Sequence, residues 1–365
     1  MKATNPYRKL PRRAFWSTSV AKSAKMKGMV DDLWQPSFQL TKDHPVATVG
    51  SCFAQHISSA LVQAGFKWVQ AERPTFGLSE QAARDFGYSI FSVRTGNIYT
   101  TKMLRQWLSW VRDPETQDTE FWESQDAVFD PVRPQIEPGG FEDAEDMAAA
   151  RKSTIAAFHR AIEEASVFIF TLGLTEYWEN IETGLVYASC PGTVAGEFDP
   201  ALHRFRNSKY PEVLEDLEEI RKSLRAINPE IKLLLTVSPV PLVATAEEGK
   251  HVLTATTHSK STLRSAAGDF SSNYQDVDYF PSFEIVTHPG LDRQMFEDDR
   301  RSVRPDGVDF VMEHFLAGLG LVHRSPTSRG SDGVDAIATS VEETQKADEI
   351  VCEEIELERF NDNRD

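Results

Sequence analysis

Three uninterrupted runs of apolar residues constrain the fold of this chain more than any other feature. The runs are VATV at 46–49, VFIFTLG at 167–173 and IKLLLTVSP at 231–239, and a shorter run, VDYF, follows at 277–280. Strands that are apolar at almost every position are covered on both faces, which is typical of parallel sheets. Because helical patterns separate the runs, the sequence predicts an α/β fold with a covered parallel sheet.

Helical periodicity accompanies these strands. Apolar residues recur at helical spacing over 53–64, 149–164, 211–227 and 306–319. The intervening region 66–150 shows no regular alternation and holds four of the seven tryptophans. We interpret it as a large insertion after the first helix that partly covers a site.

Composition divides the chain into three parts. Residues 1–44 form a basic N-terminal segment, whose first 30 residues hold eight lysines and arginines and no acid. Residues 45–323 are expected to form the α/β domain. Residues 324–365 form an acidic tail, because the stretch 331–365 holds twelve acids against three basic residues. Its polar composition predicts disorder.

Charge and cysteine content argue against several kinds of partner. The formal net charge of −17 disfavours binding to nucleic acid. No run of about 18 apolar residues is present, so no membrane span is expected. The cysteines, Cys52, Cys190 and Cys352, lie far apart in the sequence and predict neither a disulfide framework nor a metal site. They fit a reducing, cytoplasmic location. No cofactor is expected, and the sequence leaves the oligomeric state open.

The turn after the first predicted strand carries residues suited to nucleophilic chemistry. It reads Gly50-Ser51-Cys52 and leads directly into the predicted helix. Ligands of open parallel sheets bind beyond the carboxyl ends of the strands. A helix N-terminus there lowers the pKa of a thiol and offers N–H groups to a developing oxyanion. Small residues with a serine cap also form ordinary tight turns, so spacing alone leaves both interpretations open.

The motif VGSCFAQHI at 49–57 resembles the signature of the GSCFA family, a branch of the SGNH/GDSL hydrolase superfamily. Supporting motifs follow in order over most of residues 45–320, namely RTGNIYT, TLGLTEYW, VSPVPL and YFPSFEI. The resemblance implies a three-layer α/β/α fold around a parallel sheet of about five strands. It also implies relatives that cleave or transfer acyl groups on carbohydrates, in a family often found beside surface-polysaccharide synthesis.

Carried over residue by residue, the resemblance assigns roles at this corner. The superfamily's nucleophile stands two positions after the first glycine, and counting from Gly50 that position is Cys52. The abundance of serine nucleophiles in the superfamily favours Ser51 instead, and of the two we favour Cys52. The second motif implies that Gly96 contributes an oxyanion donor, with Asn97 beside it.

The third motif departs from the family's Gly-x-Asn-Asp pattern. It reads Gly173, Leu174, Thr175 and Glu176, so a threonine stands at the position of the oxyanion-binding amide. A hydroxyl donates one hydrogen bond where an amide donates two. The expected oxyanion and substrate-binding set therefore comprises Gly50, Gly96, Asn97, Gly173, Thr175 and Glu176.

The last motif lacks the expected Asp-x-x-His pair. Arg301 occupies the aspartate position and Arg304 the histidine position before the final helix. Arginine stays charged and does not act as a general base. His288 and His258 are the alternative bases, and each also has an ordinary interpretation as a surface or core histidine. A thiol at a helix N-terminus tolerates this loss better than a hydroxyl, because it ionises more readily.

Two functional hypotheses follow. The first is an acyl ester hydrolase or acyltransferase that acts on O-acyl groups of a glycan or related small substrate through a covalent acyl-enzyme, with Cys52, Ser51 and His288 as the catalytic candidates. The second is a catalytically degenerate binding module involved in surface-polysaccharide synthesis. A redox role for Cys52 is a minor third interpretation, because no other cysteine is near it in the sequence.

Overall fold

A four-stranded parallel sheet lies at the centre of the computed structural model, which describes residues 5–23, 29–74, 77–291, 293–321 and 352–361. Its strands are β1 (Val46–Gly50), β4 (Val167–Leu172), β7 (Lys232–Val237) and β8 (Val277–Phe280), in the spatial order β1-β4-β7-β8. Every neighbouring pair is parallel. The predicted α/β class and the four apolar strands are confirmed.

The expected count of about five strands is wrong by one. The backbone of Trp68 runs beside β1, where it forms only an isolated parallel bridge with Val46. Val46 donates to the carbonyl of Lys67, and Val69 donates back to the carbonyl of Val46, both at 2.9 Å. The chain then turns away, and Ala71 bonds to Ser92 instead. A fifth strand is therefore begun at this edge and not continued.

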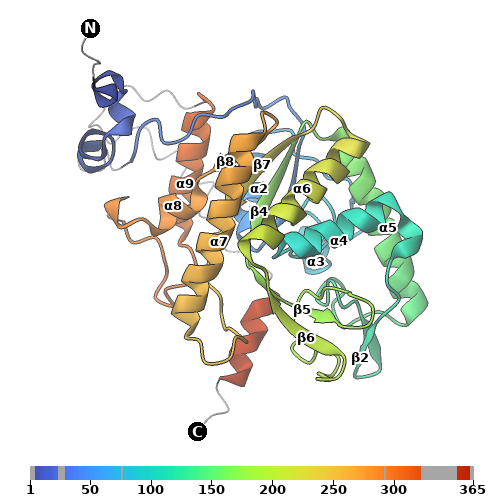
Figure 1. The fold of residues 1–365 in the computed structure, drawn as a ribbon. Helices are drawn as coiled ribbons and strands as arrows, with labels where there is room; N and C mark the ends of the chain where they lie inside the picture. Colours follow the sequence, from blue (N-terminus) through green and yellow to red (C-terminus); the bar gives the residue numbers. More distant parts are fainter. Residues whose placement is uncertain (1–4, 24–28, 75–76, 292, 322–351, 362–365) are drawn as a thin grey trace.

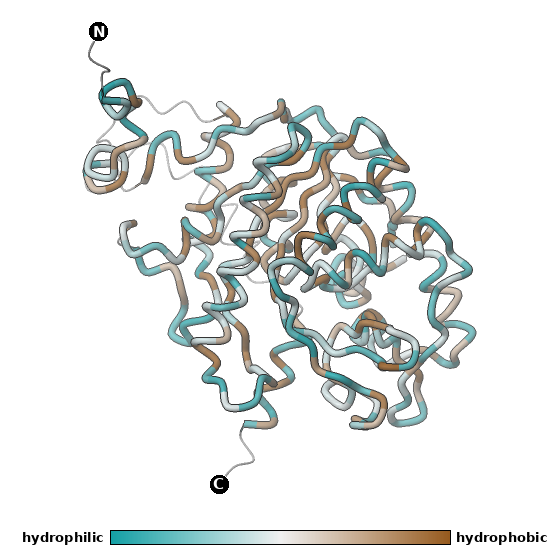
Figure 2. The backbone as a smooth tube through the Cα atoms, in the orientation of Figure 1, coloured by the Kyte–Doolittle hydropathy of each residue, from teal (hydrophilic) through white to brown (hydrophobic). Residues whose placement is uncertain are grey.

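Helices cover both faces of the sheet and give the expected three layers (Figure 1). Alternate residues of β4 point to opposite sides, so Ile169 packs in one core cluster and Phe168 in the other. The Ile169 side is covered by α2 (Phe53–Gln63), α8 (Ser282–Thr287) and α9 (Pro305–Gly318). The Phe168 side is covered by α4 (Thr101–Arg112), α5 (Ala144–Glu164), α6 (Tyr210–Ile227) and α7 (Val252–Asn273). Hydrophobic residues concentrate along the central strands in Figure 2.

The region 66–150 is more regular than its sequence pattern indicates. It contains α3 (Glu80–Asp85), α4, the 3₁₀ turn η4 (Pro114–Thr116), the antiparallel pair β2 (Trp122–Ser124) and β3 (Ala127–Phe129), and the start of α5. Because α4 packs against α5 and α6, this region completes one layer of the fold. The apolar face of α4 was hidden by Lys102, Arg105 and Gln106, which interrupt its apolar residues before Trp107.

A buried ionic cluster fixes the loop at 94–100. Asp130 accepts from Arg133 at 2.8 Å and from Arg151 at 2.6 Å, and all three side chains are almost fully buried. Arg133 also donates to the carbonyl of Arg94 at 2.9 Å. Charges this deep are stable only as a bonded set, so the cluster gives the loop a single position.

Beyond the carboxyl ends of the central strands lies a second, antiparallel pair. It consists of β5 (Glu176–Asn180) and β6 (His203–Asn207), and β5 also forms a bridge between Glu179 and Val186. Figure 1 shows the pair below the central sheet.

The terminal segments also contact the domain. The N-terminal segment contains η1 (Pro6–Lys9), η2 (Arg12–Ala14) and η3 (Ser17–Ala21), and η5 (Pro289–Leu291) follows α8. The acidic tail contains a 3₁₀ helix, η6 (Glu353–Phe360), so the expected disorder is wrong for residues 352–361. Residues 322–351 and 362–365 of that tail lie outside the described residues. In the described part of the chain, no helix combines the length and hydrophobicity needed to cross a membrane.

Candidate active site

The Gly50-Ser51-Cys52 corner has the predicted strand–turn–helix form. β1 ends at Gly50, whose φ of 145° lies in a region that favours glycine. A Cβ atom at Gly50 would lie 2.6 Å from the carbonyl oxygen of Thr171, so β4 approaches too closely for any side chain. Cys52 then caps the N-terminus of α2. Both Ser51 and Cys52 are buried.

Main-chain hydrogen bonds bring the three motifs together at this corner. Ile98 of the second motif donates to the carbonyl of Gly50 at 2.8 Å. Gly173 and Leu174 of the third motif both donate to the carbonyl of Tyr99 at 2.9 Å. The loops that follow β1 and β4 therefore meet the loop at 94–100, as the resemblance implied.

Two side chains of the second motif form a donor pair. Asn97 Nδ2 and the Tyr99 hydroxyl both donate to Oε2 of Glu353, each at 2.7 Å. Gln55, on the first turn of α2, donates to Asn97 Oδ1 at 3.1 Å and so aims the amide nitrogen at the carboxylate. A single oxygen that accepts from two fixed donors is the arrangement that an oxyanion requires. Glu353 is only 1% exposed.

A pair of thiols lies beside this donor pair. The Cys52 and Cys352 side chains are hydrogen-bonded to each other. Tyr99 Oη lies 3.6 Å from Cys352 Sγ, and an Arg301 guanidinium nitrogen lies 3.8 Å from it. The hydrogen bond from Cys52 lowers the pKa of Cys352, and the charge of Arg301 lowers it further against the effect of burial. The hydrogen bond to Cys352 and burial raise the pKa of Cys52.

Two further ionisable groups face the corner. Lys260 on α7 is 2% exposed and donates to the carbonyl of Gly173 at 2.7 Å. Burial lowers its pKa to about 8, although the negative charges of Glu354 and Cys52 act in the opposite direction. Glu354 accepts from Arg301 at 3.2 Å. Burial first, and then the charge of Cys352, raise the pKa of Glu354 to about 8.

Several predicted site residues have other partners. The Thr175 hydroxyl donates to Asn207 Oδ1 at 2.7 Å, and so does not face the corner. The Gly173 N–H is already bonded to Tyr99, so it is not an oxyanion donor. Glu176 accepts from the hydroxyl of Thr245 at 2.8 Å. Of Gly173, Thr175 and Glu176, Gly173 approaches the corner, where a Cβ atom on it would lie 2.8 Å from Ser51 Cβ.

The histidines considered as bases are not brought to the corner. His288 is exposed at the end of α8, where its Nδ1 accepts from Gly290 and its ring packs against Trp16. His258 is exposed on α7. Arg304 binds Asp306 at 2.9 Å on the surface. Of the residues in the last motif, Arg301 alone reaches the corner.

Sequence reasoning missed Tyr99, Gln55, Lys260 and the residues Cys352 to Glu354. Tyr99 was visible inside the second motif, and Gln55 inside the first. Lys260 had a weaker signal, since it lies among the inward residues Ser259 and Leu263 of a helix with little hydrophobic periodicity. The tail residues had no signal, because their partners are distant in the sequence.

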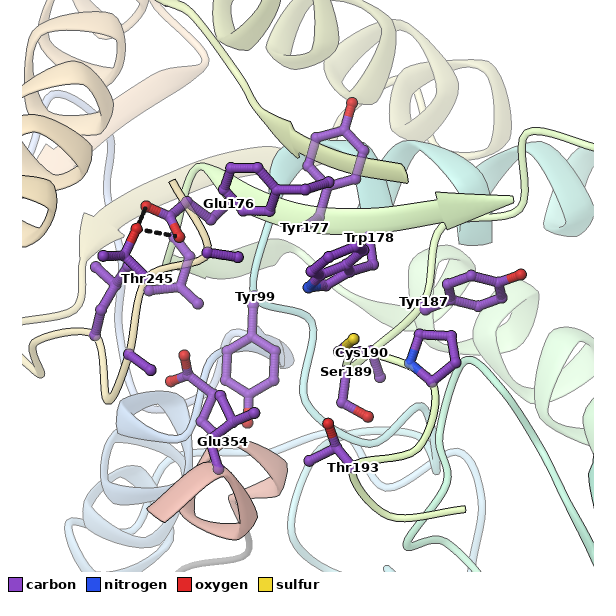
Figure 3. A pocket seen from close by; sticks show the side chains of 18 of the residues that line it. Tyr99, Glu176, Tyr177, Trp178, Tyr187, Ser189, Cys190, Thr193, Thr245 and Glu354 are labelled. Carbon is purple, nitrogen blue, oxygen red and sulfur yellow. Dashed lines mark hydrogen bonds between the residues drawn. The ribbon is translucent and has the colours of Figure 1, made fainter. Parts of the chain in front are cut away.

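A cavity of about 410 Å³ opens beside Tyr99 and Glu354. Its wall is largely apolar, with several aromatic rings, and comes mainly from the β5–β6 pair, the 187–193 loop, residues 242–246 and η6 (Figure 3). The aromatic lining residues are Tyr99, Tyr177, Trp178, Tyr187, Phe198, Phe205 and Phe360. Glu176, which was expected to bind substrate, lines the same cavity with Thr245.

The chain belongs to the GSCFA family, whose model matches residues 45–315. This confirms the family indicated by the motifs and places the corner, the donor pair, Lys260 and Arg301 within the matched region. The tail residues 352–361 lie beyond it. No curated protein sequence matches the chain.

Solved structures with some likeness have low identity. An acetyl esterase variant crystallised with an acetate ion and a carbohydrate esterase family 3 protein from Talaromyces cellulolyticus are each 9% identical, with TM-scores of 0.34, over 82% of this chain and 99% of theirs. A structure described as a platelet activating factor from Streptococcus pneumonia is 16% identical, with a TM-score of 0.26 over 43% of this chain. The match spans 60% of that protein, less than two thirds of its length. At these TM-scores the likenesses carry no argument about activity.

Proposed function

We propose that the protein is an acyl ester hydrolase or acyltransferase that forms a covalent acyl-enzyme at the Gly50-Ser51-Cys52 corner. The observation that carries the proposal is the donor pair of Asn97 and Tyr99, which binds one oxygen of a carboxylate next to the thiols. The Glu353 carboxylate stands in for the acyl group of a substrate, whose carbonyl oxygen becomes an oxyanion during attack.

Cys52 is the proposed nucleophile. It stands at the N-cap position of α2, whose N-terminus favours a negative charge, and the charge of Arg301 acts to lower its pKa. The hydrogen bond to Cys352 and burial outweigh this and raise the pKa of Cys52 while the tail is docked, so a nearby base is needed to take its proton. The Ser51 hydroxyl is buried and has no hydrogen-bond partner among the residues that the structure describes. A serine without an adjacent base is a weak nucleophile, so the contacts favour the thiol.

Lys260 is the proposed proton acceptor in place of the missing Asp-His pair. Its pKa of about 8 makes the neutral amine accessible near neutral pH, and its charge interacts with that of Cys52. The Cys52 sulfur attacks the ester carbonyl carbon, and Asn97 and Tyr99 hold the oxyanion. The C–O bond then breaks, the alcohol leaves with a proton from Lys260, and a thioester remains. Water or a sugar hydroxyl then accepts the acyl group.

The aromatic cavity supports an acylated carbohydrate as the substrate. Aromatic rings pack against the apolar faces of sugars, and their hydroxyl and indole groups add hydrogen bonds. The cavity adjoins Tyr99, so a sugar held there would present an O-acyl group to the donor pair. No interaction with nucleic acid is proposed.

Intact-mass analysis of the reduced full-length protein with p-nitrophenyl acetate tests this proposal. We expect an acetyl adduct on the peptide that contains Cys52, absent in Cys52→Ala and retained in Cys190→Ala, which removes the thiol that lines the cavity. Because the docked tail competes for the site, Glu353→Ala is tested in parallel and is expected to acylate faster. An acetyl adduct on Ser51 would show that Ser51, and not Cys52, is the nucleophile.

The binding-module hypothesis is favoured by one observation: His288 and His258, the two candidate bases, are exposed and away from the corner. It predicts no adduct and no turnover in any variant, together with retained binding of an acylated oligosaccharide. That combination would refute the acyl-enzyme proposal.

A further inference from the structure

Three consecutive residues of the C-terminal tail each bind a different part of the nucleophile corner. Cys352 contacts the thiol of Cys52, Glu353 occupies the donor pair, and Glu354 binds Arg301. Cys352 and Glu353 are buried and Glu354 is partly buried, whereas the rest of η6 is partly or fully exposed. Further along the tail, Arg359 donates to the carbonyl of Thr193 at 2.8 Å.

The thiol pair has the chemistry needed for a disulfide. Both cysteines are buried in the same core cluster, and each thiol is the largest influence on the pKa of the other. A disulfide would join their sulfurs at about 2.05 Å. The Tyr99 hydroxyl and the Arg301 guanidinium lie beside Cys352 Sγ and favour its thiolate, which is the reactive form.

We propose that Cys52 and Cys352 form a reversible disulfide that holds the C-terminal segment across the nucleophile corner. The oxidant is a peroxide. The Cys352 thiolate attacks one oxygen of hydrogen peroxide, the O–O bond breaks, and hydroxide leaves and is protonated to water. Cys52 then attacks the resulting sulfenic sulfur; the S–S bond forms, the S–O bond breaks, and a second water leaves with the Cys52 proton. Two thiols lose two electrons, and one peroxide becomes two waters.

The disulfide itself does not depend on the proposed function, but its effect on activity does. In the oxidised protein Cys52 has no free thiol, and Glu353 stays in the donor pair. The acyl chemistry proposed above is then blocked, and a dithiol reductant restores it. Cys190 offers a contrast, because burial raises its pKa to about 11 and it contacts neither of the other cysteines.

Peptide mapping of the oxidised full-length protein tests the proposal. The reduced protein is treated with one equivalent of hydrogen peroxide, denatured, alkylated and digested without reductant. We expect two of the three cysteines to resist alkylation and one linked peptide pair to contain Cys52 and Cys352. Cys190→Ser should give the same linked pair. Cys352→Ser should give none, while its circular dichroism spectrum confirms that it folds.

Other outcomes would overturn the proposal. They are full alkylation of both thiols after peroxide treatment, oxidation of Cys52 to a sulfinic acid without a cross-link, and a link that forms only between separate molecules. The test separates the two proposals, because a linked pair in a protein that never forms an acetyl adduct retains the disulfide and refutes the acyl-enzyme. An acetyl adduct in a protein that gives no linked peptide pair retains the acyl-enzyme and refutes the disulfide.

Discussion

Glu353→Ala should open the nucleophile corner, and its effect can be worked from the contacts. The carboxylate accepts two hydrogen bonds of 2.7 Å, from Asn97 and Tyr99, and is almost fully buried. Hydrogen bonds to charged groups contribute about 1.5–3 kcal/mol each, or about 3–6 kcal/mol for the two. Burial raises the pKa of Glu353, which shows that desolvation of its charge offsets part of this gain.

We take about 2 kcal/mol as the net loss of docking free energy, which corresponds to about 30-fold in the fraction of molecules with an undocked tail. The assay is the rate at which iodoacetamide alkylates Cys52 in the folded, reduced protein, followed by peptide mass. When opening is fast relative to alkylation, the rate is proportional to the open fraction. The variant should therefore react about 30-fold faster.

Glu358→Ala is the matched control. Glu358 is exposed on the same helix, and its substitution by alanine removes the same charge as Glu353→Ala does. It should leave the alkylation rate unchanged. Since loss of a nearby charge also affects thiol reactivity, amide hydrogen exchange of residues 352–361 provides a second measurement, and its protection should fall by a similar factor. Equal rates in the wild type and Glu353→Ala, or an equal increase in Glu358→Ala, would refute the docking argument.

Three other predictions concern the corner and its support. Cys52→Ser should strongly reduce acyl turnover, whereas Ser51→Ala should cost a factor of about 10–100 at most and His288→Ala nothing; steady-state kinetics with p-nitrophenyl acetate measure all three. The pKa of Lys260 is about 8 in the folded protein and about 10.4 in an unfolded chain, so the unfolded chain binds more protons between these values and stability rises from about pH 8 to pH 10. Lys260→Met should remove that rise in urea unfolding. Asp130→Ala should lower the free energy of unfolding by about 3–5 kcal/mol, because it leaves two buried arginines without their partner; an unchanged melting temperature would contradict this.

The elements that the sequence predicted are those with a strong local pattern. Apolar runs located all four central strands, and the Gly-Ser-Cys turn located the corner, because both depend on residues adjacent in the chain. Arg301 was read as a defect of the last motif, since a residue type does not reveal which groups it faces. In the structure its charge lies beside Cys352 Sγ.

The tail contact was beyond prediction for a physical reason. Cys352 and Cys52 are 300 positions apart in the sequence, and the tail's acidic composition resembles that of a solvated segment. Its docking depends on a few specific polar bonds, which leave no hydrophobic periodicity. The position of the Thr175 side chain was not predicted for a related reason. Its hydroxyl binds Asn207, which belongs to a strand with no apolar signal in the sequence.

The docked Glu353 also has a kinetic consequence for any ligand of the corner. A carboxylate tethered to the same chain is present at a fixed effective concentration, however dilute the protein is. It therefore acts as a built-in competitive inhibitor: a substrate must displace it, so the apparent KM rises by the docking equilibrium while kcat at saturation is unchanged. Dilution does not relieve this inhibition, but a sufficiently high substrate concentration does.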